Sequence, residues 1–349
     1  MSDVQKYFVD FHDSIKIVMG DNKELKEKRD EIIELIKSNL RSETSNSFET
    51  FSQGSYAMKT GIKALDDGDY DIDVGIIFTL NKDEEKPVIL KEIVSKVLLE
   101  EYDDVQIKVP CVTVKFENEV KENRNYHVDF AVYIKDENED MFIAKGKPGS
   151  NDENKYWEDS DPKELLNKIQ NSYSKDCERK QFRRVIRYLK RWKDLRFKNQ
   201  VNRPTGIGLT IAALDKFEVK YTLDPVSFKR KYNDLEALRN FVSNMINGFY
   251  YVFENDEEGY RLSVKLPTKP FNDVYKNISL KQMNDFKSKL ENLNEVLSEA
   301  AKCTDPKEAC ELLAKEFGED FPIPDEKDTA QSKNKAILTN TSSAHELND

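Results

Sequence analysis

The sequence predicts an α+β protein with two lobes. A lobe of mixed sheet and helices is followed by a helical lobe, and the active site lies in the cleft between them. Apolar runs of strand length fall in the first half of the chain, at residues 71–80, 105–116 and 126–134, whereas the second half has almost only helical periodicity. The length of 349 residues also favours two lobes, because a single core rarely grows that large.

Composition narrows the class of protein. Hydrophobic residues make up 38% of the chain and charged residues 35%, which is typical of a soluble protein with a sizeable core. The net charge of −11 disfavours binding to extended nucleic acid. Four cysteines without a C-x-x-C pair and only three histidines favour neither a structural zinc site nor a disulfide scaffold. No leader and no apolar run of ~18 residues is evident, so we expect a cytoplasmic protein without membrane contact.

The elements of the first half follow from periodicity and turn residues. We expect helices at residues 1–20, 22–40 and 88–101, strands at 71–80, 105–116 and 126–134, and a hairpin tip at 117–125. Residues 41–50 are rich in Ser and Thr and should lead into the loop that follows. Pro110 implies a bulge or an edge position in its strand, because proline cannot donate a ladder hydrogen bond.

Two carboxylates stand at the start of the strand at 71–80. Asp71 and Asp73 are two residues apart and therefore project from the same face of a strand. Side by side they repel each other, and a divalent cation is the usual remedy. Ligands made only of oxygen favour Mg²⁺, for which Mn²⁺ can substitute. A lone D-x-D pair is common, so its meaning depends on the neighbouring residues.

The loop before these carboxylates, Gln53-Gly54-Ser55-Tyr56, supplies the second part of a nucleotide site. Glycine lets the backbone approach a phosphate closely, and serine can donate through its N–H and its hydroxyl. Tyr56 could stack a base, although such a tyrosine is more often part of the core or a wall. Loop and carboxylates together suggest a nucleoside triphosphate held on a metal ion.

A third acid, Asp129, lies in the middle of the strand at 126–134. Alternation places Val128, Phe130 and Val132 on one face of that strand and Asp129 on the other. A mid-strand acid can simply face solvent. In the functional interpretation it is the third arm of the same metal site, because an unpaired buried carboxylate is costly.

The second half is predicted to be nearly all helix. We expect helices at residues 163–173, 179–198, 209–217, 230–253, 279–301 and 305–316, a short strand or extended segment at 260–266, and a disordered tail at 325–349. Residues 136–160 are polar and contain Gly and Pro, which favours a linker or a mobile loop. Asp161-Pro162 is typical of a helix start.

The helix at 179–198 carries a basic stripe. Arg183, Arg187 and Lys190 share one face of it, in a chain that is otherwise acidic. The stripe is either a solvated basic face or a set of phosphate ligands opposite the carboxylates. Thr205, at the start of the next helix, is a further candidate for a phosphate contact.

Several motifs together resemble a known family. They are Gln53-Gly54-Ser55-Tyr56-Ala57-Met58 with Thr60, Asp71-Ile72-Asp73 with Gly75, His127-Val128-Asp129-Phe130-Ala131, Arg184 to Asp194, and Phe317 to Pro322. Over about residues 45 to 324 the chain resembles the bacterial cGAS/DncV-like nucleotidyltransferases (CD-NTases) of the polymerase-β-like superfamily. The spacing of 15 residues between Ser55 and Asp71 exceeds the usual pattern, which leaves Asp69 with Asp71 as a rival pair.

The resemblance implies an enzyme that joins nucleoside triphosphates, ATP among them, into a cyclic di- or trinucleotide signal of anti-phage (CBASS) defence. It implies Asp71, Asp73 and Asp129 as catalytic residues and metal ligands. Gln53, Gly54, Ser55, Tyr56, Arg187, Lys190 and Thr205 are the implied nucleotide-binding residues. The alternative is an enzyme of the same fold that modifies an RNA, a small molecule or a protein.

The order of the expected strands and helices divides the chain into two lobes. The catalytic lobe is expected at residues 1–158, with N-terminal helices that can pack on both lobes, and the helical lobe at 159–324. Proteins of the same defence operon are the expected macromolecular partners.

Overall fold

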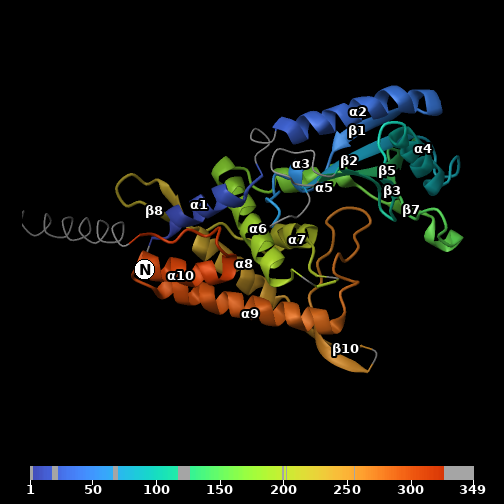
Figure 1. Cartoon of the computed structure of the whole chain (residues 1–349). Coiled ribbons are helices and arrows are strands. Elements are labelled where there is room, and N and C mark those ends of the chain that lie inside the picture. The colour runs from blue at the N-terminus through green and yellow to red at the C-terminus, as the bar shows by residue number, and fades with distance from the viewer. Residues whose placement is uncertain are drawn as a thin grey trace, which may run out of the picture.

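The computed structural model describes residues 3–17, 23–65, 70–116, 126–198, 200–201, 203–254 and 256–325. A sheet with helices lies at one end of the molecule and a bundle of helices at the other (Figure 1). The predicted α+β architecture is therefore confirmed. None of the helices within these residues is long and apolar enough to cross a membrane.

The sheet is organised around two strands that carry the predicted acids. β2 (Tyr70–Thr79) and β5 (Tyr126–Lys135) pair in parallel along their length. The strand order is β1-β2-β5-β4-β3, with β6 beside β5 and β7 beside β6. The remaining strands are β1 (Phe48–Ser52), β3 (Val105–Ile107), β4 (Val112–Phe116), β6 (Met141–Ala144) and β7 (Trp157–Asp159). They pair antiparallel, so the sheet is mixed, as predicted.

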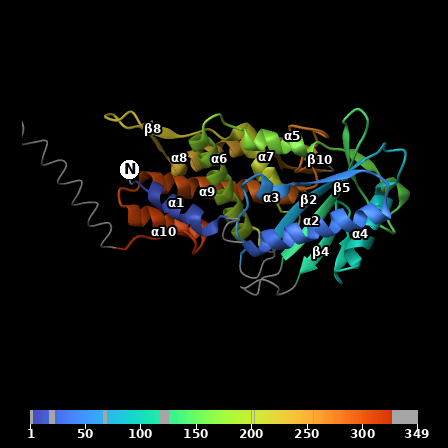
Figure 2. The same ribbon diagram turned by 90° about the horizontal axis from the view of Figure 1, so that it is seen from above.

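Helices cover the face of the sheet that lies opposite the acids (Figure 2). The two are α2 (Lys23–Glu43) and α4 (Pro87–Leu99). Their apolar side chains share one core with alternate residues of the central strands, such as Val74 and Val128, which are fully buried. Because side chains alternate along a strand, Asp71, Asp73 and Asp129 turn to the other face.

The helical lobe is built around α6 (Asp176–Arg196), which runs through its middle (Figure 1). Its other helices are α1 (Gln5–Ile15), α5 (Pro162–Gln170), α7 (Gly206–Lys216), α8 (Asp234–Asn247), α9 (Leu280–Lys302) and α10 (Pro306–Phe317). Two hairpins, β8 (Tyr221–Leu223) with β9 (Arg230–Tyr232) and β10 (Tyr250–Glu254) with β11 (Glu257–Arg261), extend from it. α1 packs into this lobe through Phe8 and Phe11, whose rings contact Tyr188 of α6.

Three predicted elements of the sheet lobe are wrong in detail. Residues 136–160 are not a linker, because β6 and β7 add two strands there, with the short helix η1 (Asp152–Asn154) between them. These strands are only four and three residues long, too short to show a period, and β7 has Trp157 as its one apolar residue. Residues 105–116 form two strands with a turn at Pro110. The stretch at 41–50, for which no strand was predicted, contains the end of α2 and the beginning of β1.

The helix predicted at 230–253 is also wrong at both ends. α8 stops at Asn247, before Gly248, and the aromatic and β-branched residues after it form β10. The hairpin tip predicted at 117–125 and the tail from residue 326 lie outside the described residues, and the lobe boundary at 158 stays a prediction.

Candidate active site

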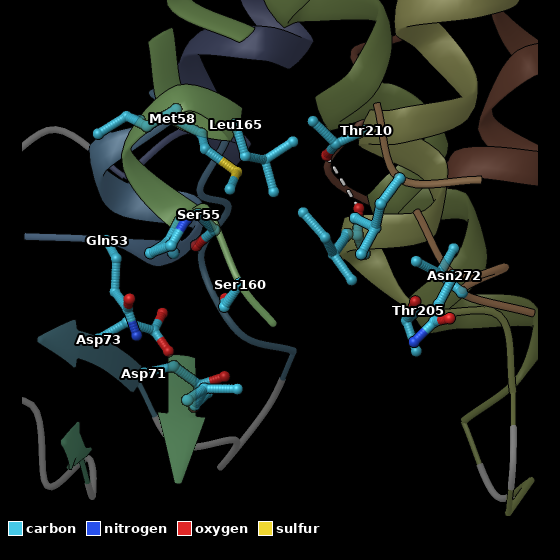
Figure 3. A pocket seen from close by; sticks show the side chains of 18 of the residues that line it. Gln53, Ser55, Met58, Asp71, Asp73, Ser160, Leu165, Thr205, Thr210 and Asn272 are labelled. Carbon is cyan, nitrogen blue, oxygen red and sulfur yellow. Dashed lines mark hydrogen bonds between the residues drawn. The ribbon is translucent and has the colours of Figure 1, made fainter. Parts of the chain in front are cut away.

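A cavity of about 1180 Å³ lies between the two lobes. The sheet lobe contributes Gln53, Ser55, Asp71 and Asp73 to one side, and the helical lobe contributes Thr205, Thr210 and Asn272 to the other, as Figure 3 shows. Asp71 and Asp73 therefore meet the predicted loop at one wall, whereas Asp129 is not among the residues that line the cavity. The cleft between the lobes is where the sequence placed the site.

The register of β2 and β5 brings the three acids together. Asp73 is the direct partner of Asp129, and Asp71 is the partner of His127. The Nε2 atom of His127 lies 3.0 Å from an oxygen of Asp71 and 3.9 Å from an oxygen of Asp129. Thr113 of β4 donates its hydroxyl to Asp129 at 2.5 Å. Asp73 and Asp129 thus lie side by side on neighbouring strands, and Asp71 lies two residues before Asp73 on the same face of β2.

Electrostatics at this cluster call for a cation. Burial raises the pKa of Asp73 to about 6, and the charges of Asp71 and Asp129 add to the effect. His127 has a raised pKa, chiefly because it is hydrogen-bonded to Asp71. Among the described residues, no three His, Cys, Asp or Glu side chains are already arranged so that they could hold a metal ion. The donor set of three repelling carboxylates nevertheless fits a hard divalent cation.

The loop after β1 is fitted tightly against Asp73. Gly54 has φ +70°, and a Cβ at this position would lie 1.8 Å from an oxygen of Asp73, so that only glycine fits. The N–H of Gln53 donates to the carbonyl of Asp73 at 3.1 Å, and its side-chain oxygen accepts from the Tyr133 hydroxyl at 2.9 Å. α3 (Gly54–Ala57) begins here, and Gly54 and Ser55 line the cavity.

Tyr56 does not reach the cavity. It points to α2, where the guanidinium of Arg29 lies 5.8 Å from the centre of its ring. The structure therefore offers no base-stacking position for this residue, and its assignment to the nucleotide site is not supported by its placement.

The basic stripe of α6 divides between the cavity and the protein interior. Lys190 lines the cavity, and its Nζ donates to the carbonyl and the hydroxyl of Thr60 at 3.1 and 3.0 Å. Burial lowers the pKa of Lys190 to about 7, helped by the nearby charges of Lys193 and Arg187. Arg187 does not line the cavity and donates instead to backbone carbonyls.

Thr205 lies where the sequence placed it, at the start of a helix that faces the cavity. Its hydroxyl accepts from the N–H of Gly208 at 3.1 Å and so caps α7. The cap explains the threonine without a ligand. Its position on the cavity wall, across from Asp71, leaves it available for a phosphate contact (Figure 3).

Sequence reasoning missed most of the charge in the cavity. Among the described residues of its wall, eight are lysine or arginine and six are aspartate or glutamate, although the chain as a whole is acidic. The cations are Lys63, Lys145, Lys190, Lys193, Lys198, Arg203, Lys269 and Lys276. Lys190 was predicted from the basic stripe, but the others come from several separate segments, and no single motif joins them. The wall therefore has a small excess of cations, although Lys145 and Lys193 pair with Glu158 and Asp194 of the same wall.

His127 and Thr113 were also missed as members of the site. His127 falls on the same strand face as Asp129, and this alternation was the available signal. Thr113 had none, because only the pairing of β4 with β5 brings it to Asp129.

Residues 48–133 match the family model described as "Cyclic GMP-AMP synthase DncV-like, nucleotidyltransferase domain". These residues are thus similar to a DncV-like nucleotidyltransferase domain. Over 183 residues, 49% of this chain, it is 28% identical to a curated cyclic GMP-AMP synthase of Escherichia albertii. The match spans 38% of that relative's length. The nucleotidyltransferase domain contains Asp71, Asp73 and Asp129 and the loop that precedes them.

The fold around the nucleotidyltransferase domain is shared more widely. E. coli MS115-1 CdnC with ATP superposes with a TM-score of 0.63 at 17% identity, covering 91% of this chain and 98% of that chain. CdnC in a complex with HORMA-deltaN gives a TM-score of 0.65 at 18% identity over the same shares. The DncV cyclic AMP-GMP synthase of Vibrio cholerae gives 0.55 at 20% identity, covering 84% and 76%. The resemblance to the cGAS/DncV-like nucleotidyltransferases is thus confirmed.

Proposed function

We propose that this chain joins nucleoside triphosphates into a cyclic di- or trinucleotide and releases pyrophosphate. The observation that carries the proposal is the meeting of Asp71 and Asp73 with the Gly54–Ser55 loop at one wall of the cavity, with Asp129 beside Asp73 on the neighbouring strand. The matched nucleotidyltransferase domain and the cyclic GMP-AMP synthase among its relatives support the product class.

The three carboxylates would hold the divalent cation, with Mg²⁺ as the expected ion and Mn²⁺ as its substitute. When bound, such an ion neutralises the triphosphate and lowers the pKa of the attacking hydroxyl. Asp71 is the most open of the three, with 64% of its side chain exposed, against 26% for Asp129. Asp71 is therefore the first contact for an arriving ion, and Asp73 is its buried anchor.

The donor nucleotide would lie along the loop with its phosphates at the start of α3. Gly54 allows the phosphates close to the backbone, and Ser55 offers its N–H and hydroxyl. Lys190 and the other cations of the wall offset the charge of the triphosphate. Thr205 faces the same space from the opposite side.

The acceptor nucleotide would present a ribose hydroxyl to the α-phosphate of the donor. The hydroxyl oxygen forms the new P–O bond, the bond to pyrophosphate breaks, and Asp129 accepts the hydroxyl proton. The cavity volume of about 1180 Å³ exceeds the usual 300–1,000 Å³ of a site for one small ligand. Two nucleotides can therefore occupy it together, and a second round closes the ring.

The biological setting belongs to the same proposal. ATP is the expected substrate among others, since E. coli CdnC was solved with ATP. CdnC was also solved with a HORMA partner, which supports a protein partner for this chain. The role in anti-phage defence is proposed from the resemblance of the sequence motifs to the family.

Product analysis tests the function directly. Purified protein is incubated with labelled ATP, GTP, CTP and UTP, singly and mixed, with Mg²⁺, with Mn²⁺ or with a chelator, and the products are treated with phosphatase. We expect a phosphatase-resistant cyclic product that needs the divalent ion and disappears in the double variant Asp71→Asn/Asp73→Asn. The substitutions keep the shape of the side chains and remove their charge.

The matched control is Asp152→Asn/Glu153→Gln, which removes two exposed carboxylates of η1. It should leave product formation unchanged. A linear product, or transfer only after RNA or protein is added, would assign the chain to the alternative class that modifies another acceptor. Absence of transfer under all these conditions would contradict the proposal.

A further inference from the structure

The backbone of residues 59–63 lies between the candidate site and α6. Toward the site, the N–H groups of Lys59 and Thr60 donate to the carbonyls of Tyr56 and Ser55, both at 2.9 Å. The segment is thus bonded directly to the helix that begins with the Gly54–Ser55 loop. Lys59 has φ +56°, a conformation that costs free energy in a residue other than glycine and must be held by its surroundings.

Cations of α6 hold the other side of this segment. Arg187 donates to the carbonyl of Lys59 at 2.7 Å and to that of Gly61 at 3.0 Å, from two arms of one guanidinium. Lys190 donates to the carbonyl between them, on Thr60, at 3.1 Å, and Arg191 to that of Lys63 at 3.0 Å. Four of the five carbonyls of residues 59–63 are therefore bound by one face of one helix.

Arg187 is the centre of this arrangement. It is only 9% exposed and uses its third arm on His12 of α1, whose Nε2 atom lies 3.0 Å away. Arginine has no acceptor, so the histidine nitrogen must accept this bond. A planar fork with five donors can serve two carbonyls and a ring nitrogen at once, whereas an ammonium group is a single point.

We propose that Arg187 is a positioning residue, which fixes the Gly54–Ser55 loop through the backbone of residues 59–63 and does not bind the triphosphate. The inference deepens the proposed function, on which its kinetic consequence rests. The hydrogen bonds from α6 to the carbonyls of residues 59–63 are called the clamp below. Arg187 and Lys190 then have different tasks, because Lys190 takes part in the clamp and also lines the cavity.

Arg183 supplies a matched control. It belongs to the same stripe one turn earlier, and the bond that it makes with its guanidinium to the carbonyl of Gln170 is long, at 3.4 Å. Neither it nor Arg187 lines the cavity. The variants Arg187→Met and Arg183→Met each remove one cation of α6 and keep an unbranched side chain. General loss of charge affects both equally, and loss of the clamp affects only the first.

Hydrogen exchange on the protein alone is the first readout. In Arg187→Met the amides of Lys59 and Thr60 should exchange about 10-fold faster or more, with no such change in the amides that join β2 and β5. Arg187→Lys should give a partial effect, and Arg183→Met none. The measurement needs no substrate, so it stands even if the chain proves not to transfer nucleotides.

Nucleotide binding and turnover are the second readout. Turnover in Arg187→Met should fall by about 10- to 100-fold, because a small displacement of the loop misaligns the donor. The ratio of affinities for ATP and AMP, measured with Ca²⁺ in place of Mg²⁺, should stay as in the wild type. A fall in this ratio with unchanged exchange at residues 59–60 would make Arg187 a phosphate ligand and overturn the inference.

If Arg187→Met fails to fold, Arg187→Lys and His12→Ala carry the test. His12→Ala removes the acceptor for the third arm without touching the two carbonyl bonds, so exchange at residues 59–60 should rise by a smaller factor. Unchanged exchange in both variants would equally overturn the inference.

Discussion

Acidification should weaken the fold through a single histidine of α1. The Nε2 atom of His12 faces the guanidinium of Arg187 at 3.0 Å, and Nδ1 lies 3.0 Å from an oxygen of Asp13. The neutral ring, with its proton on Nδ1, satisfies both contacts. A second proton on Nε2 would place an imidazolium against a guanidinium, so protonation and the folded structure oppose each other.

The size of the effect follows from the pKa. Burial, and then the charge of Arg187, lower the pKa of His12 from 6.5 to about 4. The charge of Lys16 also lowers this pKa, whereas the hydrogen bond and the charge of Asp13 raise it. The side chain is only 14% exposed, so solvent screens little of this. Between pH 6.5 and about 4 the unfolded chain binds the proton and the folded chain does not. Stability is therefore lost as the pH falls through this window, by about 3 kcal/mol in total.

Comparison with His12→Gln isolates the effect from the other acids of the chain. Glutamine can place an oxygen near the position of Nε2, accept from Arg187, and stay neutral at every pH. Urea unfolding of both proteins between pH 8 and pH 4 should give a wild type that loses stability relative to the variant as the pH falls. The chain has only three histidines, so an NMR titration of the His12 ring can be assigned.

A constant difference in unfolding free energy across this range would refute the reasoning. So would an NMR pKa for His12 near 6.5, because the guanidinium would then exert no force on the ring. A difference that shifts in favour of the wild type at low pH would mean that the imidazolium gains a partner that the folded structure does not show.

Three further substitutions test the site and its support. Asp73→Asn should raise the unfolding free energy by about 2 kcal/mol at pH 7 without divalent ions, because the pKa of Asp73 is raised to about 6 and its charge is unfavourable above that pH. The same substitution should abolish product formation. Gly54→Ala should lower it by at least about 2 kcal/mol more than Gly149→Ala, since both glycines have positive φ but a Cβ would meet atoms only at Gly54. Lys91→Met should cost about 2–4 kcal/mol in urea unfolding, because its buried ammonium donates to the carbonyls of Lys108, Val109 and Gly146. Lys96→Met on the same helix should cost much less, because the Lys96 ammonium is exposed and pairs with Glu43 at the surface. Equal losses of unfolding free energy in Gly54→Ala and Gly149→Ala would contradict the steric argument for Gly54. Equal losses in Lys91→Met and Lys96→Met would contradict the argument from the buried hydrogen bonds of Lys91.

The acids of the site could be predicted because their positions depend on a local rule. Period-two alternation places Asp71 with Asp73, and Asp129 opposite Val128, whatever the neighbours of the strands are. Proximity between the two strands needed more. It rests on the parallel pairing of β2 with β5, which the structure shows and periodicity does not. The motif resemblance implied only that the three acids share one site.

The cations could not be assigned in the same way. Helical spacing shows that Arg187 and Lys190 share a face, but a carbonyl and a phosphate are both satisfied by the same donor. Only the path of residues 59–63 decides between them, and that path is set by long-range contacts to α1 and α6. Tyr56 illustrates the same gap, because the placement of α2 turns it away from the cavity.

The two charge layers of the site are each unfavourable without a ligand. Asp73 has a raised pKa because it is buried and because Asp71 and Asp129 lie near it, and Lys190 has a lowered pKa because it is buried and because other cations lie near it. Each layer partly relieves the other, since the Lys190 charge lowers the pKa of Asp73 and the Asp73 charge raises that of Lys190. A divalent ion at the acids would weaken this mutual relief and leave the cations in need of an anion. A triphosphate supplies it, so ion and nucleotide should bind with positive coupling and stabilise the fold more together than the sum of each alone.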